Sequence, residues 1–212
     1  MRIRIALPLL LLAGAATAGA TTYLVQLTTD QLSTSSTYYL DFQLNDGDNV
    51  QDNEVDLSDF NFGGFTPVGS PQFNGGGGSG DLVSGFILQD VDFFNQITQG
   101  FTPTGTVTLS FLLTYTENFD TSDPSNVPDE FVFTIDTDNS GSPGNSVVSS
   151  GQHSLVVVDI QPGAVPVTYP ADNQYNNFEA TITSIPEPAS WGLSAAGLLL
   201  GLALRRRRSA GR

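Results

Sequence analysis

The sequence predicts an all-β fold, a single antiparallel β-sandwich of jelly-roll type, over residues 21–184. Short runs rich in β-branched and aromatic residues recur through this span, and such residues favour strands. Gly, Asn, Asp, Ser and Pro fill the gaps between the runs, as turns require. Before the C-terminal tail, no segment keeps the 3.6-residue periodicity of a helix, although 91–98 is compatible with a helical turn.

The expected strands show the two-residue alternation of side chains that points successive residues to opposite faces. The alternation is clearest in 130–136, where Phe131, Phe133 and Ile135 are expected to point into the core. Frequent turns between eight or nine such strands are typical of a sandwich. The glycine-rich tract 75–80 is expected to be a flexible loop, and 162–177 an irregular connection. In chain order, the expected strands are 22–28, 36–44, 54–62, 81–89, 107–116, 130–136, 154–160 and 178–183.

The N-terminus has the pattern of a signal peptide. Arg2 and Arg4 precede the apolar run 5–13, and small residues follow. Both 16–18 and 18–20 fit the A-x-A cleavage pattern. We expect residues 1–20 to be removed by cleavage after Ala20, with cleavage two residues earlier as the alternative.

The C-terminus combines a short rigid motif, an apolar run and a basic cluster. The run 189–204 would form about 24 Å of transmembrane helix, just short of a hydrocarbon core of roughly 30 Å. A basic cluster after such a run is typical of the cytoplasmic side of a membrane. The motif consists of Pro186, Glu187 and Pro188, and the cluster of Arg205, Arg206, Arg207 and Arg208.

This arrangement over residues 185–212 resembles the PEP-CTERM sorting signal of Gram-negative bacteria. The resemblance implies recognition in the inner membrane by an exosortase and cleavage near the motif. An uncleaved single-pass anchor is the alternative. The preceding domain resembles small uncharacterised families of PEP-CTERM proteins, which implies a β fold and no particular chemistry. That likeness rests on the segments 23–27, 39–44, 57–60, 63–64, 80–82 and 109–111.

Charge is distributed unevenly along the chain. All seven basic residues are arginines in the two ends, so residues 21–185 contain no Lys or Arg. All but one of the 22 acidic residues lie in that span, which leaves it 21 carboxylates and one histidine. A domain without cations cannot bind nucleic acid through its phosphates, so we expect no such partner. Divalent cations, polyamines, cationic peptides and amino sugars remain, unless the acidity serves only solubility.

The sequence offers little for catalysis. It has no cysteine, and His153 is its one histidine, which excludes thiolate chemistry and multi-histidine metal centres. Ser149, Ser150 and Ser154 are near this histidine in sequence, but no Gly-x-Ser-x-Gly elbow is present. We therefore expect that the protein is not an enzyme.

Calcium is the cofactor that the residue pattern suggests. Asp136, Asp138 and Ser140 stand at the first, third and fifth positions of a loop with Gly141 at the sixth, as an EF-hand loop begins. Val147 occupies the twelfth position, where a bidentate glutamate would be needed.

A second acidic group, Asp46, Asp48, Asp52 and Glu54, lies in a turn rich in Asn and Gly. For both groups of residues, an ordinary solvated turn is the alternative to calcium binding.

Taken together, these features predict an exported, exosortase-processed structural or adhesive protein. We expect an inner-membrane intermediate and then the cell envelope or an extracellular polysaccharide matrix, with exopolysaccharide as a partner. One alternative is a carbohydrate-binding module that stacks sugars on Tyr38, Tyr169 or Tyr175. The other is a matrix glycosidase, since paired carboxylates could come from the many acids.

Overall fold

The computed structural model describes residues 20–120, 127–139, 145–148 and 154–185. The signal peptide predicted for 1–20, except its last residue, lies outside this part of the chain, as does the predicted tail from 186 to 212. Among the described residues, no helix is long and apolar enough to cross a membrane.

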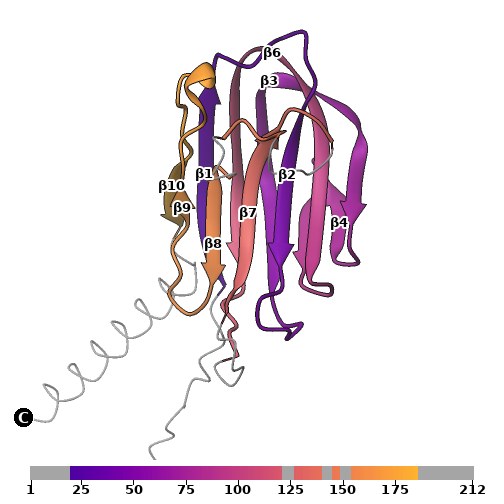
Figure 1. Ribbon diagram of the computed structural model, residues 1–212, viewed down its shortest axis with the longest axis vertical. Coiled ribbons are helices and arrows are strands. Elements are labelled where there is room, and N and C mark those ends of the chain that lie inside the picture. Colours follow the sequence, from indigo (N-terminus) through magenta and orange to yellow (C-terminus); the bar gives the residue numbers. More distant parts are fainter. Residues whose placement is uncertain (1–19, 121–126, 140–144, 149–153, 186–212) are drawn as a thin grey trace, which may run out of the picture.

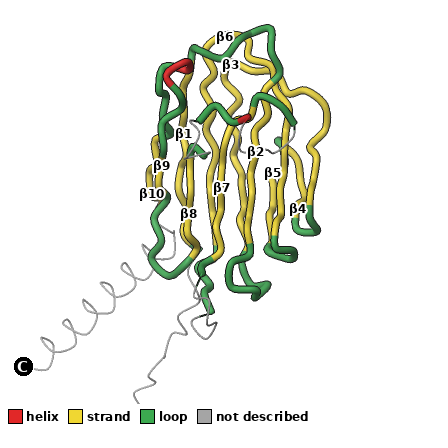
Figure 2. Tube along the Cα trace, viewed as in Figure 1, coloured by secondary structure: helices red, strands yellow, loops and turns green. Residues whose placement is uncertain are grey.

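The described part is built almost entirely from antiparallel strands, which confirms the all-β expectation (Figure 1). One short 3-10 turn, η2 (Asn173–Tyr175), stands out in the trace (Figure 2). The strands are β1 (Thr21–Thr29), β2 (Tyr38–Asn45), β3 (Glu54–Asn74), β4 (Gly78–Asp81), β5 (Gly85–Gln89), β6 (Phe94–Tyr115), β7 (Asp129–Asp136), β8 (Val156–Ile160), β9 (Val167–Thr168) and β10 (Thr181–Ile185).

The strands form two layers that belong to one continuous hydrogen-bonded sheet (Figure 1). The first half of β6 pairs with β2, and its second half pairs with β1. β3 pairs with β6 along most of its length, so both long strands run through the two layers. One layer therefore continues from β6 through β2, β7, β8 and β9, and the other contains β10, β1, β3, β5 and β4.

Bulges allow β3 to bend from one layer into the other. Its register with β6 shifts at three places, between Ser58 and Asn61, between Gly63 and Phe65, and between Val68 and Gln72. Extra residues on one strand increase local twist and bend the strand, as the change of layer requires. Gly64 has a φ of +83°, and a Cβ there would lie 1.8 Å from the Thr106 carbonyl oxygen.

Aromatic side chains fill the space between the layers. Phe111 of β6 lies edge-on to Phe42 of β2 and to Phe133 of β7, with ring centroids 5.6 and 5.2 Å apart. All three side chains are fully buried. Phe131 and Ile135 are buried as well, so the expected inward face of this strand is confirmed.

Several expectations for single segments are wrong. The segment 91–98, compatible with a helical turn, instead leads into β6, which begins at Phe94 and forms a ladder with β2. The strand expected over 81–89 is divided into β4 and β5, so the end of the glycine-rich tract is itself a strand. The irregular connection 162–177 contains β9 and η2.

Candidate metal centre

Three connections meet at the lower end of the sandwich in Figure 1, and each carries aspartates. They are 46–53 between β2 and β3, 90–93 between β5 and β6, and the described residues of the β6–β7 connection, which leads to Asp129. The ladders bring them together, because Asn45 is paired with β6 on one side and with β7 on the other. Acids far apart in sequence therefore become neighbours in space.

Five carboxylates form what we call the aspartate cluster: Asp46, Asp48, Asp52, Asp90 and Asp129. Asp129 belongs to two groups, one with Asp46 and Asp48 and one with Asp52 and Asp90. Within each group, oxygens from the three carboxylates lie within 4.8 Å of one another. Asp129, Asp48 and Asp90 are at most 2% exposed, whereas Asp52 is open to solvent. The cluster is thus buried on one side and accessible on the other.

Asp129 is held in place from both sides. Its Oδ1 accepts a hydrogen bond from the Gly47 amide at 2.7 Å, and its Oδ2 accepts one from Asn53 Nδ2 at 2.8 Å. Gly47 allows this approach because a Cβ there would lie 2.2 Å from the Pro128 carbonyl oxygen. Only glycine fits the backbone at this position without displacing the chain.

Asp90 is fixed by main-chain amides of the β2–β3 connection. Its Oδ2 accepts hydrogen bonds from the amides of Asp52 at 3.0 Å and Asn53 at 2.8 Å. The buried Asn53 also accepts hydrogen bonds through its side-chain oxygen from the Thr116 hydroxyl and the Asn118 amide. This asparagine therefore joins all three connections.

The remaining buried aspartates shape the turn that contains them. Asp46 Oδ1 accepts a hydrogen bond from the Asn49 amide at 2.6 Å, and Asp48 Oδ1 accepts one from the Val50 amide at 2.9 Å. Asp48 Oδ2 also accepts from the Asp120 amide at 2.9 Å, which ties in the β6–β7 connection. Such bonds from side chain to backbone stabilise tight turns. The cluster therefore contributes to the structure of these connections, whether or not it binds an ion.

Burial works against the negative charge of the cluster. It raises the pKa of Asp90 to about 6, and the neighbouring Asp129 adds to the rise. Partial burial of the carboxyl groups also raises the pKa of Asp46 and of the more exposed Asp52, and nearby carboxylates raise both further. Residues 21–185 contain no Lys or Arg that could pair with these acids. Protons or bound cations must therefore supply the compensating charge.

The donor set fits a hard divalent cation. Carboxylate oxygens are ligands that Ca²⁺ and Mg²⁺ prefer, whereas softer metals favour imidazole or thiolate. Calcium tolerates irregular surroundings of six to eight oxygens, but magnesium requires near-octahedral geometry. Carboxylates that already accept hydrogen bonds from main-chain amides cannot easily rearrange into an octahedron, so they fit calcium better than magnesium.

The sequence anticipated part of this cluster. Asp46 and Asp48 lie in one carboxylate group and Asp52 in the other, and Asp129 links the two groups. Glu54 lies in neither group, and its Oε2 accepts a hydrogen bond from Gln89 Nε2 at 2.9 Å on the neighbouring strand. Asp90 and Asp129 were missed. Asp90 directly follows β5, and Asp129 begins β7. Their positions at strand ends were the feature that could have identified them. The sequence does not show, however, which strand ends lie next to one another.

The other predicted calcium loop is arranged differently. Asp136 ends β7 with a buried side chain that is hydrogen-bonded to Asp41 of β2. Asp138 is exposed, and its Oδ2 accepts a hydrogen bond from Asn145 Nδ2 at 2.7 Å. Ser140 lies outside the described residues. The two described acids of this loop therefore have different partners.

The three tyrosines considered for sugar stacking have different environments. Tyr38 is buried against Phe101, with ring centroids 5.9 Å apart, and its hydroxyl accepts a hydrogen bond from the Ser33 amide. Tyr169 is half-buried, and its amide donates to the Leu155 carbonyl.

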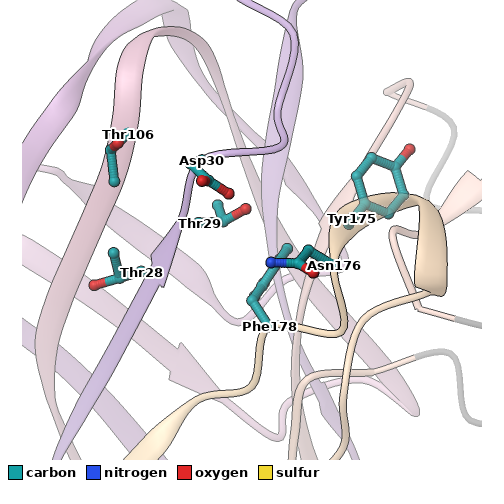
Figure 3. A pocket seen from close by; sticks show the side chains of 7 residues that line it. All are labelled: Thr28, Thr29, Asp30, Thr106, Tyr175, Asn176 and Phe178. Carbon is teal, nitrogen blue, oxygen red and sulfur yellow. The ribbon is translucent and has the colours of Figure 1, made fainter.

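Tyr175 is half-buried and lines a pocket of about 330 Å³ (Figure 3). The other lining residues are Thr28, Thr29, Asp30, Thr106, Asn176 and Phe178. A second pocket, of about 230 Å³, includes Tyr39 and Asn139.

The β domain is followed by a C-terminal sorting signal. Residues 184–208 match the family described as the PEP-CTERM protein-sorting motif. The chain thus carries the signal of exosortase-targeted proteins, which are exported to the surface or the extracellular space of Gram-negative bacteria. No curated protein and no solved structure matches the chain.

Proposed function

We propose that the protein is a non-catalytic structural or adhesive component of the cell envelope or the extracellular polysaccharide matrix, and that calcium stabilises it. The observation that carries the calcium proposal is the aspartate cluster, with its buried carboxylates in a domain without Lys or Arg. A divalent cation bound there would connect three loops and remove much of their repulsion. Millimolar calcium suffices for extracellular modules with dissociation constants of about 10⁻⁴–10⁻³ M.

The test is the melting temperature of residues 21–185 in calcium, in magnesium and in sodium chloride at equal ionic strength. Ten millimolar calcium should raise it by roughly 3–10 °C, because an ion that binds only the folded state stabilises that state. Asp129→Asn should abolish the rise, since both carboxylate groups share this residue. The control is Asp59→Asn, an exposed acid of β3 that belongs neither to the cluster nor to the other predicted calcium loop. Equal rises in all three salts would contradict specific calcium binding, because they would show only ordinary screening of charge by salt.

A glycosidase is less consistent with the arrangement of the carboxylates. A glycosidase needs two carboxyl groups that reach the scissile bond from a cleft. Asp90 and Asp129 are 2% and 1% exposed, and their oxygens are engaged with amides of the loop. Turnover assays on matrix polysaccharides test this alternative, and product release that disappears in Asp90→Asn would overturn the non-catalytic proposal.

Glycan binding is a second candidate function, favoured by the pocket at the end of β1. Asp30 and Thr29 face this space from one side and Asn176 from the other, with the ring of Tyr175 beyond Asn176 (Figure 3). Hydroxyl, carboxylate and amide groups near an aromatic ring are suited to a polyhydroxylated ligand.

A glycan array with the purified domain tests this function. Signals lost in Asp30→Asn and Tyr175→Ala but kept in Tyr39→Ala would place binding at this pocket. A blank array, or signals that all three variants retain, would remove the pocket as a glycan site and leave the structural role.

A further inference from the structure

The last strand of the domain directly precedes the sorting motif. β10 ends at Ile185, and the match to the motif begins at Ser184, so these two residues belong to both. Pro186 follows immediately in the sequence. Proline has no N–H, so it cannot extend the ladder as a donor. The sorting motif thus begins within the last strand that the structure describes.

This junction leaves very little chain between the fold and the membrane. The sequence-predicted apolar run begins at Ala189, four residues after Ile185. Four extended residues span about 13 Å. A folded domain on so short a tether obstructs an enzyme that must reach the motif at the membrane surface.

β10 is built so that it can leave the fold at low cost. Within the described residues, it pairs with β1 and no other strand, in a register of five residue pairs that includes Leu24 with Thr183. Four of its five side chains are exposed, and only Ile182 packs against the core. Edge strands with few buried apolar contacts open with low free energy. Release of β10 would lengthen the tether by about 17 Å.

We propose that β10 is a releasable spacer, detached from β1 while the exosortase acts on the motif and paired with β1 again afterwards. The inference depends on the sorting motif and on the β1–β10 ladder, not on calcium or glycan binding. It assigns to β10 a second role besides closing the sheet, because its pairing controls how readily the motif reaches the enzyme.

The chain offers a direct test because it contains no cysteine. Leu24→Cys with Thr183→Cys places two thiols on directly paired residues of β1 and β10. Directly opposite strand residues lie within the Cα separation that a disulfide allows. The full-length variant would be produced in a host with the matching exosortase, and the fraction that keeps its tail measured by intact-mass spectrometry over time.

The oxidised variant should be processed at least tenfold more slowly than the natural protein, and a membrane-permeant reductant should restore the rate. Val132→Cys with Val157→Cys is the matched control, because it joins β7 to β8 and leaves β10 free. A ten-residue Gly-Ser linker after Ile185 should restore processing of the oxidised Leu24–Thr183 variant, since it supplies the missing reach. Processing of that variant at the natural rate would overturn the proposal. A block that the linker does not relieve would overturn it as well.

Discussion

The carboxyl groups of Asp41 on β2 and Asp136 on β7 are hydrogen-bonded to each other. Both side chains are buried, at 0% and 2% exposure. Gln43 and Gln96 donate further hydrogen bonds to Asp41, at 2.8 and 2.9 Å. Burial raises the pKa of Asp41, and the hydrogen bonds from Gln43 and Gln96 oppose that rise. Burial first, and then the charge of Asp41, raise the pKa of Asp136 to about 8.

This pair predicts that the folded state loses stability as the pH rises. The pKa of Asp136 is about 8 in the folded protein, against an ordinary value of 3.8. A carboxyl group with a raised pKa stabilises the fold fully below its ordinary value, and that contribution is lost as the pH rises through the folded value. The free energy of unfolding, measured with urea, should therefore fall between pH 5 and pH 8 and level off above pH 8, where the folded and unfolded states have both lost the proton. Asp136→Asn should flatten this fall, because an amide still donates to Asp41 and does not titrate.

Asp138→Asn is the control for the pH experiment. This residue lies two positions further along and its negative charge adds to the raised pKa of Asp136, but its side chain is exposed. Its removal should leave most of the slope between pH 5 and pH 8. An unchanged slope in Asp136→Asn would show that the proton is not held by this pair.

Local patterns in the sequence were sufficient to predict the class of fold and the inward face of β7. They failed where strands contain residues typical of turns. β3 includes Gly64, Pro67 and Pro71, so the sequence predicted its end near Phe62, yet it continues to Asn74. Bulges accommodate Gly64 and Pro71 while β6 pairs alongside, and Pro67 lies in the ladder opposite Phe101. A partner strand can thus override local propensity, which the sequence pattern alone does not show.

The sequence predicted only those residues of the candidate metal centre that lie close together along the chain. The aspartates of 46–52 belong to one turn, and their spacing drew attention to them. Asp90 and Asp129 join them only because β5 ends and β7 begins at the same end of the sandwich. Likewise, the spacing of Asp136 and Asp138 suggested a shared ion, but the end of β7 directs the first toward Asp41. Pairing of distant strands decides these contacts.

Phe133→Ala should destabilise the domain by about 3–5 kcal/mol, since it leaves a cavity in the core. The ring of Phe133 is fully buried, stacks on Phe42 at a centroid distance of 5.0 Å and meets Phe111 edge-on. Urea unfolding gives the free energy directly. Val132→Ala is the control on the same strand, because its side chain is only half-buried. A change below 1 kcal/mol for Phe133→Ala would contradict the described packing.

Gly47→Ala should weaken the calcium response together with the fold. The new Cβ would lie 2.2 Å from the Pro128 carbonyl oxygen, so the turn must move and the amide bond to Asp129 is disturbed. Overpacking of this kind costs about 1–3 kcal/mol. Gly69→Ala is the control, since it meets no atom within 4 Å and suffers only from its φ of +70°. Calcium titrations followed by melting temperature should show a smaller rise for Gly47→Ala than for Gly69→Ala. Equal rises for the two variants would show that calcium binding does not depend on the turn around Gly47.

The mature protein should lack the C-terminal tail. Residues 184–208 match the sorting motif, and exosortase acts on proteins that carry it. The cut is expected near Pro188, before the apolar run, so the four arginines of 205–208 should be absent from the final product. Intact-mass spectrometry of protein from a host with the matching exosortase measures this directly. A host without the enzyme is the control and should yield the chain with its tail. Arginines 205–208 found on the final product in the first host would show that the tail is a permanent anchor.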